Sequence, residues 1–402
     1  MRIEWAAGYC KFPQLPFRRI FCPVKRPVPA NAVIVTAYTN GEVTFRSNRR
    51  REGYHEATDL SGFQGVKVGD FVVHGLDILR GSIGASDSFG AISSVCAVCI
   101  PIMGAEPRFF AYAMRAQASS GFPRAMARGV REGGADFRRW DTLGDLPLPV
   151  PPEPEQQVIA DFLDVETARI DALIAKKSRL EVAITARVLA SIESVIWAPK
   201  YSRIPLRRVC RFIDYRGATP SKSNSGVSLI TASHIRDGWL DLENEPQWVD
   251  ESTYKEWMRR GWPAVGDVLL TTEAPLGNVA QITDSRVALA QRVILLKPNE
   301  SVILADFLPL ALRSLTFQNM LSAYATGSTA LGIKADRLKA LNVPVPPLVV
   351  QLAHVNEIMR QESAANRARS ALMAQISLLR QRKQALITAA VTGEMDVPGV
   401  SA

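Results

Sequence analysis

The sequence Pro149-Val150-Pro151-Pro152 recurs 195 residues later as Pro344-Val345-Pro346-Pro347. Proline is tolerated in the first turn of a helix but not in its interior, and a long stretch without Gly or Pro follows each copy. Each Pro run therefore predicts the start of a long helix, and we expect these helices over residues 153–197 and 348–393. The second ends at Thr392-Gly393, since glycine is the usual residue beyond a helix C-terminus.

Two more pairs of segments repeat in the same order. Leu15–Ile20 resembles Ile204–Val209. Val68–Val72 resembles Val265–Leu269, and both copies of this second segment carry a Gly-Asp pair before an apolar run. A nearly constant offset indicates two copies of one unit of about 195 residues. Short β-branched runs such as Val227–Thr231 predict strands in the first part of each copy.

The predicted fold is α+β, with two mixed α/β domains separated by two long antiparallel helices that form a coiled coil, in a pseudo-two-fold internal repeat. The expected boundaries are listed by number: a first mixed domain 1–152, a central helix 153–197, a second mixed domain 198–347, a C-terminal helix 348–393 and a tail 394–402. Helical stretches are also expected near residues 109–118 and 305–323, before each Pro run.

Apolar residues recur every seven positions in both long helices, which is typical of coiled-coil seams. In the first helix they are Ile159, Leu163, Ile170, Leu173, Leu180 and Ile184, and in the second Val355, Ile358, Ala365, Leu372, Ile376, Leu379, Leu386 and Ala390. One such helix alone would expose its stripe, so we expect the two to pair. Residues 155–196 of the first helix span about 63 Å at about 1.5 Å per residue, close to two DNA turns of about 34–36 Å. A coiled coil that only braces the fold or dimerises is the alternative.

The composition is that of a globular protein, because 47% of the 402 residues are hydrophobic and 22% are charged. No apolar run reaches about 18 residues and an acid stands near the start, so we expect neither a membrane span nor a signal peptide. Five cysteines, an odd number, predict a reducing cytoplasm. The net charge is +9, with the excess in the two mixed domains, as expected for a polyanion-binding chain. A solvated basic surface is the alternative.

Motifs for chemistry are missing from the sequence. It has no Gly-rich phosphate loop, no Gly-rich cofactor turn and no Asn-Pro-Pro-aromatic loop, and His55, His74, His234 and His354 lack metal-ligand spacing. Cys96-Ala97-Val98-Cys99 lies in a predicted strand, where positions i and i+3 face opposite sides, so we expect two core cysteines. No catalytic, cofactor or metal residue is therefore expected in this chain.

Candidate DNA contacts gather in segments that carry basic, hydroxyl and amide side chains, which suit phosphates and base edges. In the first domain, an arginine-rich stretch and a second arginine cluster near residues 124–139 provide candidate contacts. His74 and Asp77 of the first domain occupy the place that Thr272 and Glu273 occupy in the second domain. The tryptophans at 239, 248, 257 and 262 are expected to pack rather than to stack on bases. The full set of expected DNA-binding residues is Arg46, Asn48, Arg49, Arg50, Arg51, His74, Asp77, Arg80, Arg128, Arg131, Ser221, Lys222, Asn224, Ser233, His234, Arg236, Thr272, Glu273 and Asn278.

The following segments carry a likeness to one known family: Leu146–Pro152, Glu155–Asp164, Thr167–Ile174, Gly217–Pro220, Gly266–Leu270, Thr326–Thr329 and Arg382–Gly393. The likeness is to the specificity subunits of type I restriction-modification systems. It covers nearly the whole chain, and the Pro-Pro-x-x-Glu-Gln helix start and the closing Ala-Val-Thr-Gly segment are specific. The second helix departs from the pattern, because Val350 stands where the first has Glu155. Residues 1–152 carry the family layout only loosely.

The resemblance implies a non-catalytic subunit. Each mixed domain would be a target-recognition domain for one half of a bipartite double-stranded DNA site, and the paired helices would set the gap. They would also dock two adenine-methyltransferase subunits, and restriction (motor-nuclease) subunits would join the complex. S-adenosylmethionine, ATP and Mg²⁺ would bind to those partners, and this chain would bind no cofactor.

Two other functions stay open at the level of sequence. One is a nuclease built into a mixed domain, for which Asp241, Glu243 and Glu245 come closest to a carboxylate cluster. The other is a coiled-coil scaffold that never touches DNA, supported only by the divergence at Val350.

Overall fold

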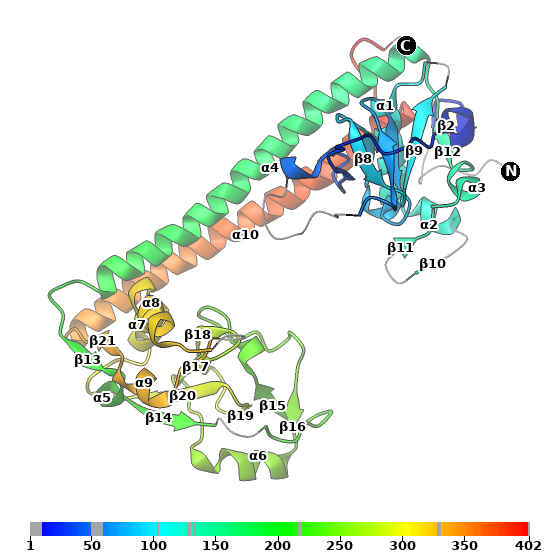
Figure 1. Ribbon diagram of the computed structural model, residues 1–402. Helices are drawn as coiled ribbons and strands as arrows, with labels where there is room; N and C mark the ends of the chain where they lie inside the picture. The colour runs from blue at the N-terminus through cyan, green and yellow to red at the C-terminus, as the bar shows by residue number, and fades with distance from the viewer. Residues whose placement is uncertain are drawn as a thin grey trace. The chain divides into compact units, whose positions relative to one another are not determined.

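The computed structural model describes residues 10–49, 59–102, 104–126, 130–131, 134–215, 219–327 and 331–400. The chain divides into two compact units, residues 1–177 with 374–402, and residues 178–373. Each unit thus contains one sheet-bearing lobe and a part of both long helices. The architecture is mixed α/β with two sheet-containing lobes, as the sequence predicts (Figure 1).

In unit 1, the lobe is built on a four-stranded antiparallel sheet in the order β2-β9-β6-β7. Its strands are β1 (Gln14–Pro16), β2 (Phe21–Pro23), β3 (Val35–Ala37), β4 (Val43–Phe45), β5 (Phe63–Val66), β6 (Phe71–His74), β7 (Ile83–Ala85), β8 (Gly90–Ser93), β9 (Cys96–Pro101), β10 (Val130–Arg131), β11 (Gly134–Ala135) and β12 (Pro147–Pro149). Its helices are α1 (Pro107–Ser119), α2 (Phe122–Met126), α3 (Trp140–Leu143) and the first part of α4 (Glu153–Ile196). The core lies between the sheet, α1 and the helix pair, around Phe17, Phe71 and Phe110.

In unit 2, the same topology recurs as a sheet in the order β14-β20-β17-β18. Its strands are β13 (Arg203–Pro205), β14 (Cys210–Asp214), β15 (Val227–Ile230), β16 (Trp248–Val249), β17 (Val268–Thr272), β18 (Leu276–Gln281), β19 (Val287–Leu289), β20 (Val293–Pro298) and β21 (Asn342–Pro344). Its helices are α5 (Leu206–Val209), α6 (Glu251–Trp257), α7 (Phe307–Arg313), α8 (Leu315–Tyr324), α9 (Ala335–Ala340) and parts of α4 and α10 (Leu348–Thr392). The predicted helix at 305–323 is divided, because the backbone at Ser314 is extended.

The repeat extends to individual contacts. Asp70 and Asp267 are both buried, and each accepts a hydrogen bond at 2.7 Å from the backbone N–H three residues earlier. Each also forms an ion pair, with Arg26 in unit 1 and with Lys297 in unit 2. The Gly-Asp turn that the sequence shows twice is therefore one structural device used twice.

The long helices begin where the Pro runs end, as predicted. The Gln156 side chain, 3% exposed, donates to the Pro151 carbonyl at 2.8 Å and accepts from the Glu106 backbone N–H at 2.9 Å. Gln351, fully buried, repeats this with the Pro346 carbonyl at 2.7 Å and the Leu304 N–H at 2.8 Å. These glutamines fix the first turn of each long helix to the Pro run and to the segment that leads into the lobe's helix.

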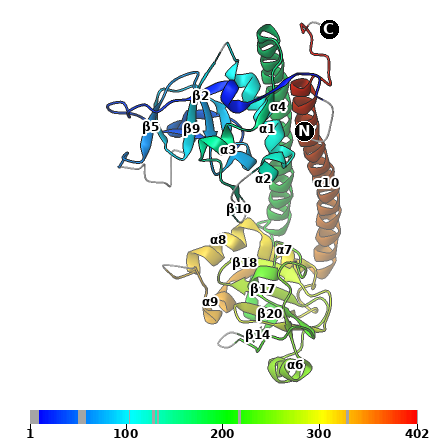
Figure 2. The same cartoon turned by 90° about the vertical axis from the view of Figure 1, so that its right-hand side faces the viewer.

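Parts of α4 and α10 lie side by side and antiparallel within each unit (Figure 2). In unit 1, Lys383 donates to Asp171 at 2.6 Å, and Lys177 donates to Gln375. In unit 2, Arg369 lies 3.8 Å from Glu181. The predicted pairing is thus present in both units.

The predicted seam of α4 is only partly right. Ile159, Leu163 and Ile170 are buried, but Leu173 and Leu180 are 42% and 51% exposed. A pair of helices covers only one side of each helix, whereas the residues near the start of α4 also pack on their lobe. The predicted row of α10 is better buried, at Ile358 and Ile376 among others.

The equivalent surfaces at the starts of the two long helices are covered differently. In unit 1, Phe12 and Ile159 pack with Met395, Val397 and Val400 of the C-terminal tail. In unit 2, the matching pair is polar, and the Tyr201 hydroxyl hydrogen-bonds His354 Nε2 at 2.8 Å. An apolar pair therefore stands where the tail covers it.

We predict that Gln156→Ala lowers the free energy of unfolding of unit 1 by about 1–3 kcal/mol, because the buried Pro151 carbonyl and the partly buried Glu106 N–H lose their partner. Gln157→Ala is the matched control, since the neighbouring side chain is exposed and its loss should cost less than about 0.5 kcal/mol. Urea unfolding followed by circular dichroism measures both, and equal midpoints for the two variants would contradict the assignment.

Candidate DNA interface

The second lobe brings together two of its three predicted segments. The Asn278 side chain donates to the Ile235 carbonyl at 2.7 Å, and the Gly238 N–H donates to the Val279 carbonyl at 2.8 Å. Residues 231–241 therefore lie against β18. The Arg236 side chain pairs with Asp241 at 3.2 Å, and Ser233 is exposed. The juxtaposed segments present hydroxyl, amide and guanidinium groups from one surface.

Two predicted contacts of this lobe are buried and act within the fold. His234, 1% exposed, accepts the Thr231 N–H at Nδ1 (3.1 Å) and has its Nε2 3.2 Å from the Glu245 carbonyl. Thr272, also 1% exposed, donates to the Arg292 carbonyl at 3.2 Å. Their side chains hold the segments in place, so we leave them out of the candidate DNA surface. Glu273 is half-buried and lies 3.5 Å from Arg292.

The third predicted segment lies elsewhere on the same lobe. Ser221, Lys222 and Asn224 are exposed, and the chain beside them pairs with β16 through the Ser223 N–H and the Trp248 carbonyl. A cavity of about 330 Å³ opens there, lined by Thr219, Ser221, Tyr215, Thr253, Trp257, Glu256, Arg259 and Arg260. Burial raises the pKa of the Tyr215 hydroxyl to about 12, and that hydroxyl donates to the Gly261 carbonyl. The two arginines are basic groups that sequence analysis missed.

In the first lobe, the predicted residues fall on two loops. Asn48 donates to the Thr44 hydroxyl at 2.9 Å, and Arg49 pairs with Glu42 at 2.6 Å while its guanidinium lies 4.8 Å from the Tyr38 ring. Arg46, half-buried, belongs to the same short helical turn, residues 46–48. Exposed Arg49 is thus held beside an aromatic ring.

The second loop follows β6, in the place that the β17–β18 turn occupies in unit 2. His74 Nδ1 accepts the Asp77 N–H at 3.0 Å, and Arg80 lies 3.8 Å from the Asp77 carboxylate. Arg50, Arg51 and Arg128 lie outside the described residues, as does the side chain of Arg131. The equivalence of the two loops, predicted from the Gly-Asp strands, is confirmed by the sheet order.

Tryptophans and cysteines follow the expectations in most cases. Trp257 Nε1 donates to the Leu289 carbonyl at 2.7 Å, and Trp262 packs on Tyr254 at a centroid distance of 5.2 Å. Trp239 differs from the expectation, because it is 56% exposed, and Trp262 is 48% exposed despite its contact with Tyr254.

Cys96 and Cys99 on β9 are both buried and belong to two different core clusters, as predicted. Burial raises the pKa of Cys96 to about 12, so this thiol stays protonated.

Within the described ranges, no group of three or more His, Cys, Asp or Glu side chains could hold a metal ion. In the same ranges, no helix combines the length and the apolar character that a bilayer crossing needs. Asp241, part of the carboxylate trio considered for a nuclease, is occupied by its ion pair with Arg236.

The chain thus has two lobes of the same sheet order, each presenting polar and basic segments and each joined to a part of the long paired helices. A family model for the type I restriction modification DNA specificity domain matches residues 263–366. The specificity subunit of the type I restriction enzyme EcoBI from Escherichia coli is 23% identical over 283 residues, which are 63% of this chain and 59% of that relative.

Solved structures show the same fold. A chain from a study of complex assembly and conformational transition of the type I R-M system covers 96% of this chain and 100% of its own length, with a TM-score of 0.74 and 16% identity. The HsdS subunit from Thermoanaerobacter tengcongensis covers 96% of this chain and 97% of its own, with a TM-score of 0.52 and 16% identity. Residues 263–366 thus match the specificity-domain family, and the chain as a whole has the fold of these solved structures.

We predict that Asn278→Ala speeds amide exchange in residues 231–241 by up to about tenfold, because one hydrogen bond that holds this segment contributes about 0.5–1.5 kcal/mol. Hydrogen–deuterium exchange with mass spectrometry measures this. Asn224→Ala, in an exposed segment, is the control and should leave those amides unchanged. Equal exchange in both variants would show that Asn278 does not hold the segment.

Proposed function

We propose that this chain is the DNA-recognition subunit of a type I restriction-modification complex and that each lobe recognises one half of a bipartite double-stranded DNA site. The duplication carries this proposal, because the Gly-Asp turns and the buried glutamines repeat in both lobes. The candidate contacts lie in segments that differ between the lobes. A shared scaffold with different loops suits one recognition task performed on two different sequences.

The long helices, in this proposal, set the gap between the half-sites and dock two methyltransferase subunits. Exposed apolar side chains at the start of α10 support docking there, since Leu348, Val349 and Leu352 are 38%, 74% and 53% exposed. The matching positions on α4 are Glu153, Pro154 and Gln157. Docking at the two helix starts therefore differs in chemistry, in line with the replacement of Glu155 by Val350.

Catalysis belongs to the partners in this proposal. S-adenosylmethionine would bind to the methyltransferase subunits, and ATP and Mg²⁺ would bind to the restriction subunits. The whole complex would work in the cytoplasm. This chain would contribute sequence choice by base-edge contacts and affinity by phosphate contacts.

Co-expression with the methyltransferase subunit, followed by mapping of methylated adenines in host DNA, tests the proposal. We expect one motif of two short specified tracts separated by a gap of fixed length, because two lobes recognise two tracts. Methylation without a bipartite motif, or metal-dependent cleavage by the chain alone, would contradict it.

Replacing Arg49, Arg50 and Arg51 with Ala should flatten the dependence of log K on log salt concentration by about one unit for each arginine that contacts a phosphate. Fluorescence anisotropy of the assembled complex on DNA, over a series of salt concentrations, measures the slope. Arg19→Ala, an exposed arginine of the same lobe, is the control. A triple variant with the slope of the unaltered complex would remove these residues from the interface.

A further inference from the structure

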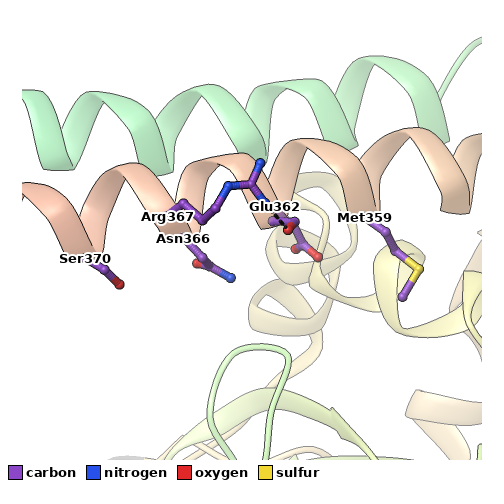
Figure 3. A pocket seen from close by; sticks show the side chains of 6 residues that line it. Met359, Glu362, Asn366, Arg367 and Ser370 are labelled. Carbon is purple, nitrogen blue, oxygen red and sulfur yellow. Dashed lines mark hydrogen bonds between the residues drawn. The ribbon is translucent and has the colours of Figure 1, made fainter.

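The Arg313 side chain joins a candidate recognition segment to a long helix. It is the last residue of α7 and its side chain is only 12% exposed. Its Nε donates to Asp237 Oδ1 at 2.6 Å, and its Nη1 lies 2.9 Å from Glu362 Oε1 on α10. Glu362 points from α10 near Met359 and Asn366 (Figure 3). We call Asp237, Arg313 and Glu362 the arginine bridge.

The turn above this bridge is shaped to meet the guanidinium. Gly238 has a φ of +95°, a conformation that favours glycine, and a Cβ there would lie 2.8 Å from Arg313 Cζ. The next contact of this turn is the hydrogen bond from Gly238 to Val279 on β18. Arg313 thus holds the backbone of the segment that carries Ser233 and Arg236, through its contacts with Asp237 and Gly238.

Unit 1 contains the same arrangement at nearly the same offset. Arg115 on α1 stands 198 residues before Arg313, and Gly41 stands 197 residues before Gly238. Gly41 has a φ of +93°, and a Cβ there would lie 2.3 Å from Arg115 Nη1. This turn joins β3 to β4, the strand that leads directly into Arg46–Asn48. One candidate recognition segment in each lobe therefore lies against an arginine.

Both arginines also interact electrostatically with carboxylates on the long helices. Burial lowers the pKa of Arg115, and the opposing attractions come from Tyr112 and from Asp171 on α4. Burial acts in the same direction on Arg313, but its pKa is raised, because Asp237 and Glu362 outweigh burial. The connection to the helix is thus a direct ion pair in unit 2 and a longer attraction in unit 1.

We infer that Arg313 is a positioning residue for sequence recognition, which sets the 231–241 segment against α10 so that the lobe's specificity depends on its link to the helix. Arg115, which lies against Gly41, supports the β3–β4 turn of the first lobe. This inference rests on the proposed function, since it assigns a role in recognition to residues that do not touch DNA.

The test uses the complex assembled with methyltransferase subunits and substrates with one base pair changed in either half-site. Methylation rates on these substrates and on the unaltered site give a discrimination ratio for each half. Arg313→Met should lower the ratio by tenfold or more in one half-site and leave the other unchanged, whereas Arg115→Met should do the reverse. Arg208→Met, an exposed arginine on α5, is the matched control and should alter neither ratio.

A second variant separates the link to the helix from local support of the turn. Glu362→Gln leaves the Asp237–Arg313 pair in place and should lower discrimination in the same half-site as Arg313→Met, by a smaller factor. Unchanged discrimination in Glu362→Gln would overturn the link to α10. Equal losses in both half-sites, or no loss, in Arg313→Met would overturn the positioning role. If the unaltered complex discriminates in neither half, the proposed function fails, and the inference falls with it.

Discussion

A buried glutamine in the first turn of each long helix is the constraint on which the structure depends. An amide side chain without access to water must find hydrogen-bond partners, and Gln156 and Gln351 find them in the Pro run and in the segment before the lobe's helix. The direction in which each helix leaves its lobe is therefore fixed by the same contacts in both halves. A lobe and its helix start form one unit that the chain uses twice.

Divergence between the copies follows the surroundings of each. Phe12 and Ile159 are apolar where the C-terminal tail covers them, and the matching Tyr201 and His354 are polar. Burial and the nearby Lys200 lower the pKa of His354, which favours its neutral form in the hydrogen bond with Tyr201. The contacts of the buried glutamines and of the Gly-Asp turns are the same in both lobes, whereas the surfaces of the two lobes carry different side chains. That combination suits a protein that performs one task on two different targets.

Strong local signals in the sequence predict several elements of the fold. Proline and glycine gave both long helices their bounds, and the period of two along a strand separated Cys96 from Cys99 correctly. The prediction that His234 and Thr272 lie on the surface is wrong, because a short polar segment after a strand carries no sign of which side chain turns inward. Arg115 and Arg313 were missed, since an arginine in an apolar helix has no local motif. The available signal was that Arg115 and Arg313 are separated by nearly the same number of residues as Gly41 and Gly238. This signal can be recognised only once the two glycine turns are known.

The central claim is that two equivalent lobes each recognise their own tract of one DNA duplex. Footprinting of the major groove with dimethyl sulfate, on the complex of this chain with methyltransferase subunits and its target DNA, tests it most directly. Two separate protected tracts with an unprotected gap of constant length are the predicted result. A single continuous tract, or protection that does not depend on the sequence of the duplex, would contradict the account.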